Sequence, residues 1–573
     1  MREAIFVAIR NILPAATALF LGAQAILPAQ AQGVAGSYLA ARQASSNSDF
    51  RIAADYFARA IIADPRNPVL MENAILAYIS LGDGDRAAAV ARRLLQVGAS
   101  SQIAHMALLV DAFQRERFEN VVEDIDAGMT IGPLVDGLLA GWAELGAGRM
   151  TGALERFNAM AESQGVEVFG LYHKALALAV VGDFEGAEEI LSGDAAGPLQ
   201  LSRRGVIAFA QVLSQLERNG DAVELIDATF GDDLDPGLQE VRGALEAGET
   251  LAFDTVRNAK DGAAEVFVVV AGALNGEAND SYTLLYARLA EILRPDHVDA
   301  ILLGAAILES LNQHTLATQS YDKIPHDHPS FSAAEIGRAE ALRQSGKTDA
   351  AIEVLKGLTE LEPQNPEVHM TLGDALRREE RYDEATKAYD AAIALYPEPG
   401  RMQWLAFFAR GITHEREKRW DQAEADFRFA LELNPGQPQV LNYLGYSFVE
   451  MGINLEEALG MIEEAVAAQP NSGYIVDSLG WVQFRMGQYQ DAVVNLERAT
   501  ELLAVDPIIN DHLGDAYWAV GRRVEAEFQW SRALSFEPEE KDAERIRRKL
   551  EVGLDVVLEE EREEPITFAA QDG

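Results

Sequence analysis

The sequence contains no cysteine, which excludes disulfides, thiolate metal sites, a cysteine nucleophile and a lipid-bearing N-terminal cysteine. Basic residues are also scarce: 48 Lys and Arg stand against 91 Asp and Glu, a formal net charge of −43. Nucleic acid requires a dense basic surface, and anionic lipid headgroups repel an acidic one, so we expect neither as a partner. The acidic balance is typical of a well-solvated surface.

Long apolar runs are missing outside the N-terminus, so we expect no other segment that spans a bilayer. Residues 1–31 have the form of an export signal: basic residues, a mostly apolar stretch over 12–27, and the small-x-small pattern Ala29-Gln30-Ala31. We expect cleavage after Ala31 and a periplasmic location for the mature chain. The alternative is an uncleaved anchor helix, which Pro14 and the short apolar core disfavour.

One short pattern recurs five times between residues 366 and 538. Each copy has a glycine, an alanine twelve or thirteen residues later, a second alanine seven residues further on, and a closing proline. The glycines are Gly373, Gly411, Gly445, Gly480 and Gly514, and the prolines are Pro397, Pro435, Pro470, Pro507 and Pro538. The glycines lie 38, 34, 35 and 34 residues apart, which indicates an internal repeat of about 34 residues.

Each copy contains two apolar-periodic stretches of helical length separated by a short turn. Glycine and alanine occupy the positions where two helix backbones must come close, and a bulky residue such as Tyr389 or Trp530 fills the space beside them. Proline ends the second helix because it lacks an N–H and clashes with the preceding turn. A single helix pair cannot bury its apolar face, so neighbouring pairs must stack.

These positions match the consensus of the tetratricopeptide repeat, and the resemblance implies an all-α fold, a right-handed α-solenoid of helix pairs. We expect divergent repeats of this type over residues 32–330 and regular repeats over 331–538. A polar capping helix over 539–556 and an acidic, disordered tail over 557–573 are expected to follow.

The resemblance also implies that the first helix of each pair lines a concave groove. Aromatic and Arg side chains are the types that anchor protein partners, and an amide such as that of Asn442 can hold an extended backbone through its donor and its acceptor. The candidate partner-binding residues are Phe408, Asn442, Tyr446, Tyr474, Trp481, Phe484, Arg485 and Trp518. For Trp481, Trp518 and Tyr446 the alternative is packing between repeats.

Repeats of this family that grip a C-terminal carboxylate use Lys and Asn in the groove. Asp477 and Asp511 stand at the matching positions here and would repel such a ligand. Catalytic signals are weak: His326-Asp327-His328 lacks a third ligand, and residues 345–348 resemble only the end of a phosphate loop. We therefore expect no enzyme activity, cofactor or metal; a hydrolase hidden in residues 100–330 is the contrary hypothesis.

A closer resemblance covers residues 438–533. The run Leu441 to Tyr446, the one-residue insertion before Leu455, and the run Asp477 to Trp481 resemble bacterial envelope repeat proteins that partner carboxyl-terminal processing proteases. Those proteins are lipoprotein adaptors that present substrates to the protease, whereas this sequence lacks the lipid-bearing Cys. The resemblance implies an exported scaffold or adaptor. An assembly factor for a secretion, pilus or surface-polysaccharide system is the alternative.

Overall fold

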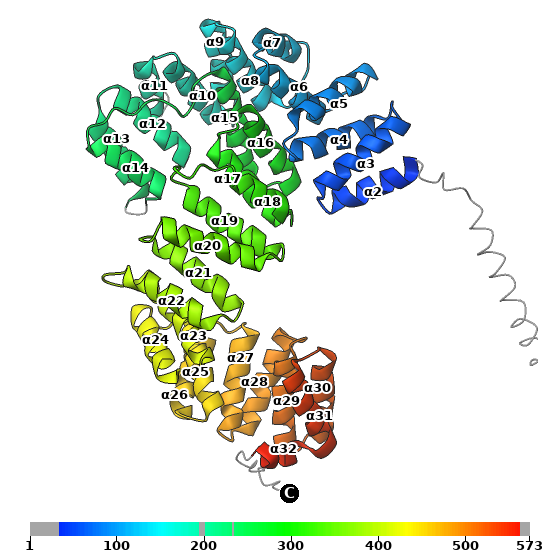
Figure 1. The fold of residues 1–573 in the computed structure, drawn as a ribbon, viewed down its shortest axis with the longest axis vertical. Coiled ribbons are helices and arrows are strands. Elements are labelled where there is room, and N and C mark those ends of the chain that lie inside the picture. The colour runs from blue at the N-terminus through cyan, green and yellow to red at the C-terminus, as the bar shows by residue number, and fades with distance from the viewer. Residues whose placement is uncertain (1–33, 194–200, 232–233, 562–573) are drawn as a thin grey trace, which may run out of the picture. The chain divides into compact units, whose positions relative to one another are not determined.

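The computed structural model describes residues 34–193, 201–231 and 234–561. Over these ranges the chain forms 31 α-helices and no strand (Figure 1). The expected all-α solenoid is confirmed, while the export signal at 1–31 lies outside the described residues. Within the described part of the chain, no helix is long and apolar enough to cross a bilayer.

The chain divides into two compact units, Met1–Val354 and Leu355–Gly573. The first unit contains α2 (Val34–Ser46), α3 (Phe50–Ala63), α4 (Pro68–Ser80), α5 (Gly84–Gln96), α6 (Gln102–Gln114), α7 (Phe118–Asp126), α8 (Pro133–Gly146), α9 (Met150–Ala161), α10 (Glu167–Val180), α11 (Phe184–Leu191), α12 (Arg203–Gln215), α13 (Asn219–Phe230), α14 (Pro236–Glu246), α15 (Ala259–Leu274), α16 (Asp280–Leu293), α17 (Val298–Ser310), α18 (His314–Tyr321) and α19 (Phe331–Gln344). The change in repeat regularity expected at residue 330 falls inside this unit, and α20 (Thr348–Leu361) spans the division between the units.

In the first unit, α15 and α16 return across the first helices of the earlier pairs. Helix α15 packs on α8 and α10, and α16 packs on α4 and α6 (Figure 1). The backbone of Gly262 approaches the indole of Trp142 so closely that a Cβ would overlap the ring, and Arg288 Nε donates to the Ser80 carbonyl at 3.2 Å. The inner side of these repeats is therefore filled by the chain's own helices.

Buried ion pairs fix α15 in that place. Glu265 accepts hydrogen bonds from Arg204 at 2.7 Å and from the Tyr172 hydroxyl at 3.0 Å. Burial alone would raise the pKa of the Glu265 carboxyl, but Arg204 and His297 hold it well below its usual range. A carboxylate compensated in this way ties α15 to α10 and α12.

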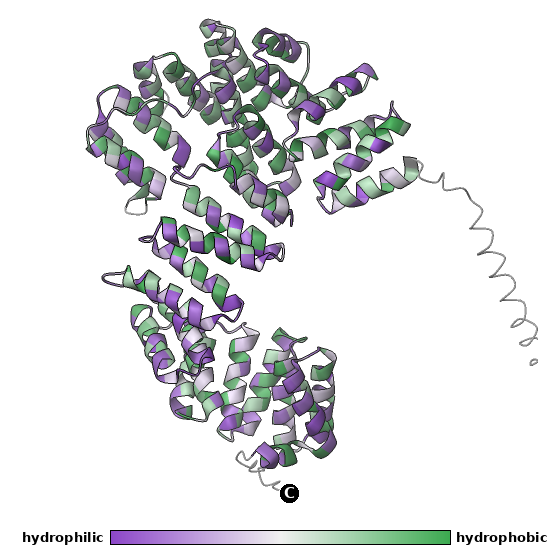
Figure 2. Cartoon of the chain, in the orientation of Figure 1, coloured by the Kyte–Doolittle hydropathy of each residue, from purple (hydrophilic) through white to green (hydrophobic). Residues whose placement is uncertain are grey.

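The second unit contains α21 (Pro366–Arg378), α22 (Tyr382–Ala394), the 3₁₀ turn η1 (Arg401–Gln403), α23 (Trp404–Arg416), α24 (Trp420–Leu433), α25 (Pro438–Met451), α26 (Leu455–Ala468), α27 (Gly473–Arg485), α28 (Tyr489–Leu502), α29 (Pro507–Ala519), α30 (Arg523–Ser535), α31 (Glu540–Val552) and α32 (Leu554–Glu561). Figure 2 shows apolar and polar residues interspersed along these helices, as expected where one face of a helix is buried.

The small residues of the repeat lie where two helices of a pair meet. A Cβ on Gly373 would come within 2.5 Å of the Tyr389 ring, and one on Gly411 within 2.6 Å of Phe427. The first alanines of the pattern, such as Ala385 and Ala492, are completely buried. A Cβ on Gly445 or Gly480 would lie 3.2 Å from the backbone oxygen of Ala458 or Ala492, so the helix backbones of a pair come close at these positions, as the sequence predicts.

The C-terminus differs from the expectation of one capping helix over 539–556 followed by a tail from 557. Gly553 adopts a left-handed φ of +86° and splits the segment into α31 and α32. Residues 557–561 are helical because Val557 and Leu558 are buried against the last repeat, and Glu560 and Glu561 pair with arginines of α31. The remainder of the expected tail, 562–573, lies outside the described residues.

Candidate functional site

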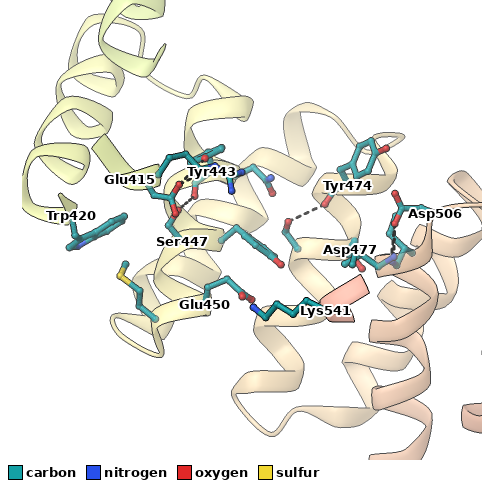
Figure 3. A pocket seen from close by; sticks show the side chains of 16 residues that line it. Glu415, Trp420, Tyr443, Ser447, Glu450, Tyr474, Asp477, Asp506 and Lys541 are labelled. Carbon is teal, nitrogen blue, oxygen red and sulfur yellow. Dashed lines mark hydrogen bonds and ion pairs between the residues drawn. The ribbon is translucent and has the colours of Figure 1, made fainter. Parts of the chain in front are cut away.

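The second unit contains a groove of about 690 Å³ on the inner side of its repeats (Figure 3). Its walls come from the first helices of four successive pairs, α23, α25, α27 and α29, with Trp420 from the start of α24 and Lys541 from α31. This is the surface that the sequence predicts for partner binding.

Three of the predicted residues, Asn442, Tyr446 and Tyr474, lie on the wall of this groove. Tyr474 is 60% exposed, which is unusual for a tyrosine in a packed repeat. The amide Oδ1 of Asn442 is shielded from solvent and has no hydrogen-bond partner among the described residues. A buried amide oxygen without a donor is costly, so Asn442 is ready to accept one from a ligand.

Trp481 and Phe484 pack between repeats rather than facing a partner. Trp481 is only 7% exposed and stacks between Phe484, at a centroid distance of 4.9 Å, and His512, at 4.0 Å. Its indole Nε1 donates to Glu450 at 2.9 Å. The expectation that these two aromatics are exposed in the groove is wrong, because α29 of the next pair places His512 over the indole.

Trp518 is likewise buried, at 7% exposure, and the C-terminal helices cover it. Gly553 lies against its ring at a distance that leaves no room for a Cβ, and its Nε1 donates to Asp555 at 3.1 Å. Phe408 is half-buried against Tyr443, and neither Phe408 nor the half-buried Arg485 lines the groove. For Trp518, as for Trp481, the packing alternative describes the observed contacts.

Asp477 and Asp511, the two carboxylates expected to repel a ligand's C-terminal carboxylate, each have an ion-pair partner within the chain. Asp477 pairs with His512 Nδ1 at 3.0 Å, and Asp511 pairs with Lys549 Nζ at 2.8 Å. Burial opposes the charge of His512, but Asp477 outweighs it and raises the pKa of the imidazole. Burial raises the pKa of the Asp511 carboxyl despite the neighbouring Lys549.

Lys549, a residue that the repeat pattern does not single out, is completely buried between Asp511 and Asp515 of α29. The spacing contains a signal for this position: Lys549 stands three residues after the apolar Ile546 and therefore on the same face of α31. Ile546 and Leu554 are themselves fully buried.

The groove itself carries more acid than base. Glu415, Glu450, Asp477 and Asp506 line it, against Arg416 and Lys541. Burial and the nearby Glu415 raise the pKa of the Tyr443 hydroxyl to about 12. Burial and Glu450 likewise raise the pKa of Tyr446, so both phenols are neutral hydrogen-bond donors at physiological pH.

Across the described ranges, no group of three or more His, Asp and Glu side chains is placed to hold a metal ion. His326, from the weak metal motif of the sequence, stacks on Phe331 at 4.5 Å, and His328 Nδ1 accepts the backbone N–H of Ser330. This segment is a turn that leads into α19.

A tetratricopeptide repeat model matches residues 38–119, 336–398 and 408–473. The sequence is 26% identical to a TPR repeat-containing protein of Pseudomonas aeruginosa over 186 residues, which is 32% of this chain. It is 25% identical to a human protein O-mannosyl-transferase over 205 residues, which is 34% of this chain. The matches span 31% and 22% of those proteins, less than a third of either.

Among solved structures, a chain of the APC/C hetero-tetramer Cut9–Hcn1 is similar over 90% of this chain and 95% of that one, with 16% identity and a TM-score of 0.37. The three segments that the repeat model matches fold as helix pairs and contain tetratricopeptide repeats, as the sequence predicts. Proteins of this class are scaffolds for protein–protein interaction.

Proposed function

We propose that this chain is a non-enzymatic scaffold that holds a segment of a partner protein in the groove of its second unit. The observation that carries the proposal is Asn442, whose amide oxygen is unpartnered on the wall of an otherwise well-packed repeat. The exposed Tyr474 and the half-buried rings of Tyr443 and Tyr446 supply apolar surface beside it.

The first unit is a poorer candidate for the same task. Its inner side is already occupied by α15 and α16, which pack on α4, α6, α8 and α10. A partner would have to displace helices that are fixed by the buried Arg204–Glu265 pair, and breaking such a pair is costly. The second unit offers its groove without such a rearrangement.

The specific role we propose is that of an exported, periplasmic adaptor that presents substrates to a carboxyl-terminal processing protease. Two features of the sequence support it: the signal-like segment at 1–31 and the resemblance of residues 438–533 to envelope adaptors of such proteases. The sequence contains no cysteine that could carry the lipid of those adaptors, so the proposed role does not depend on it. An assembly factor for a secretion, pilus or surface-polysaccharide system is the second candidate, supported by the same signal-like segment and repeats.

An affinity experiment tests the proposal. The purified chain is used to recover proteins from an envelope extract, in parallel with an Asn442→Ala/Tyr474→Ala variant and with Phe528→Ala as a matched control, because Phe528 is an exposed aromatic of α30 outside the groove. We expect the wild type and the control to recover the same partner and the double variant to lose it.

The identity of that partner separates the two candidate roles. A processing protease or a cell-wall hydrolase supports the adaptor, and a component of a secretion, pilus or polysaccharide system supports the assembly factor. Equal recovery by all three proteins would contradict the groove as the binding surface.

A further inference from the structure

In the last repeat of the second unit, the inner face binds a basic side chain that belongs to the chain itself. Lys549 of α31 places its ammonium 2.8–2.9 Å from both carboxylate oxygens of Asp511 and 2.7–2.8 Å from those of Asp515. The ammonium lies 5.8 Å from the centre of the Trp530 ring. A lysine held by two carboxylates over an indole is thus an intramolecular ligand of this repeat.

Helix α31 also contributes a residue to the groove. Lys541, at the beginning of the same helix α31, is one of its lining residues and extends beside Glu450 (Figure 3). Within the described part of the chain Lys541 is exposed and forms no ion pair. A lysine from a partner can therefore take its place beside Glu450 without breaking a salt bridge.

The groove's carboxylates differ in whether a cation already compensates them. Asp477 pairs with His512, and Glu415 lies 3.6 Å from Arg416 of its own helix. Asp506 caps the beginning of α29 by accepting the backbone N–H groups of Ile508 and Ile509. Glu450, by contrast, accepts hydrogen bonds from neutral groups, the indole of Trp481 and the hydroxyl of Tyr446. Its negative charge stays available to a ligand, at a place where Tyr474 and Ile508 offer apolar surface on the same groove.

Building on the proposed function, we infer that the groove selects an extended partner segment with a Lys or Arg flanked by apolar residues. The cation lies beside Glu450, with Glu415 adding negative charge on the same groove. Its apolar neighbours pack on Tyr474 and Ile508, and the backbone pairs with the Asn442 amide. Charge complementarity selects the residue type, while the amide fixes an extended chain rather than a helix, whose backbone groups are already paired.

The test uses the purified full chain and a positional-scanning library of N-acetylated, C-amidated decapeptides, which carry no terminal charges. We expect enrichment of Lys and Arg next to Leu, Ile, Phe or Tyr. Binding of the selected peptide should weaken at least tenfold in a Glu415→Gln/Glu450→Gln variant, measured by fluorescence anisotropy. Glutamine keeps the acceptor for the Trp481 indole, so the fold is retained.

A matched control is Glu432→Gln/Glu463→Gln, which removes two carboxylates that are exposed on α24 and α26 outside the groove. This variant has the same net charge as the groove variant, and we expect it to bind the peptide like the wild type. Equal weakening in both variants would mean that only the overall acidity attracts the peptide, and it would overturn the inference.

The remaining outcomes separate this inference from the function on which it rests. Peptides that bind in the groove without a preference for Lys or Arg, or with a preference for Asp or Glu, overturn the inference and leave the scaffold function standing. A library from which no peptide binds, together with unchanged partner recovery by the Asn442→Ala/Tyr474→Ala variant, overturns both.

Discussion

At the residue scale, the glycines and alanines of the repeat allow the two helices of a pair to pack closely, because they have no side chain or only a methyl group. Gly411 leaves room for the ring of Phe427, and Gly373 does the same for Tyr389. A methyl group at either position would overlap an aromatic ring that is itself fully buried. The cost of filling such a site is strain, since a close-packed core cannot move the ring aside freely.

The first prediction contrasts two glycines of the same unit. We expect Gly411→Ala to lower the free energy of unfolding of the second unit by about 1–3 kcal/mol because the core becomes overpacked. Gly460→Ala should instead raise it by about 0.5–1 kcal/mol, because a Cβ there meets no atom within 4 Å and alanine favours the helix.

Urea denaturation followed by tryptophan fluorescence measures both effects, since five of the six tryptophans lie in the second unit. The two changes of opposite sign exclude a general effect of replacing glycine. Equal effects of the two substitutions would contradict the role assigned to Gly411.

The repeat pattern predicts where the groove lies, but it does not predict which of the candidate aromatic residues are exposed in it. Asn442, Tyr446 and Tyr474 line the groove as expected, because the repeat consensus fixes which helix faces inward. Trp481 and Trp518 could not be assigned in this way. Their burial depends on His512 from the next pair and on Gly553 from the C-terminal helices, and the repeat pattern contains neither contact.

At the element scale, the C-terminal helices α31 and α32 close the last repeat and neutralise its inner face. Lys549 is fully buried and compensates Asp511 and Asp515, and Asp515 also accepts the indole N–H of Trp530 at 2.8 Å. Arg545 adds a second cation 3.6 Å from Asp515. The cap is therefore held by charge as well as by apolar contacts.

Removing the buried lysine tests this account of the cap. We expect Lys549→Met to destabilise the second unit by about 3–5 kcal/mol, because two carboxylates stay buried without their principal cation. Adding Asp511→Asn and Asp515→Asn should restore most of the loss, since the amides are neutral and still accept from Trp530. Urea denaturation of the single and triple variants measures both steps.

A single variant as stable as the wild type would show that the cap relies on its apolar contacts alone. A triple variant no more stable than the single one would show that geometry, rather than charge, explains the loss. Either result would contradict the assigned role of Lys549.

The sequence predicts the helices of the regular repeats, but it does not predict the contacts between helices that are far apart in the chain. The five regular repeats follow from local spacing, so their helices were predictable one pair at a time. The return of α15 and α16 across α4 to α10 joins residues far apart in the chain, such as Ser80 and Arg288, and no local pattern encodes it. Gly262 is an example, because the absence of its side chain makes room for the indole of the distant Trp142.

At the scale of the whole molecule, one type of repeat is used in two ways. In the first unit the inner side of the repeats serves internal packing, with α15 and α16 as occupants. In the second unit the same side is closed at its C-terminal end by Lys549 but is open over α23 to α29. The central claim is that this open stretch is where a partner protein binds.

Site-specific photo-crosslinking tests that claim most directly. A benzophenone amino acid replaces Tyr474 in the groove, Val494 on α28 or Val181 after α10; all three positions are exposed, and the last two lie outside the groove. On irradiation with the recovered partner, we predict a crosslink from position 474 that a selected basic peptide suppresses, and none from 494 or 181. Crosslinks from 494 or 181, with none from 474, would contradict the account.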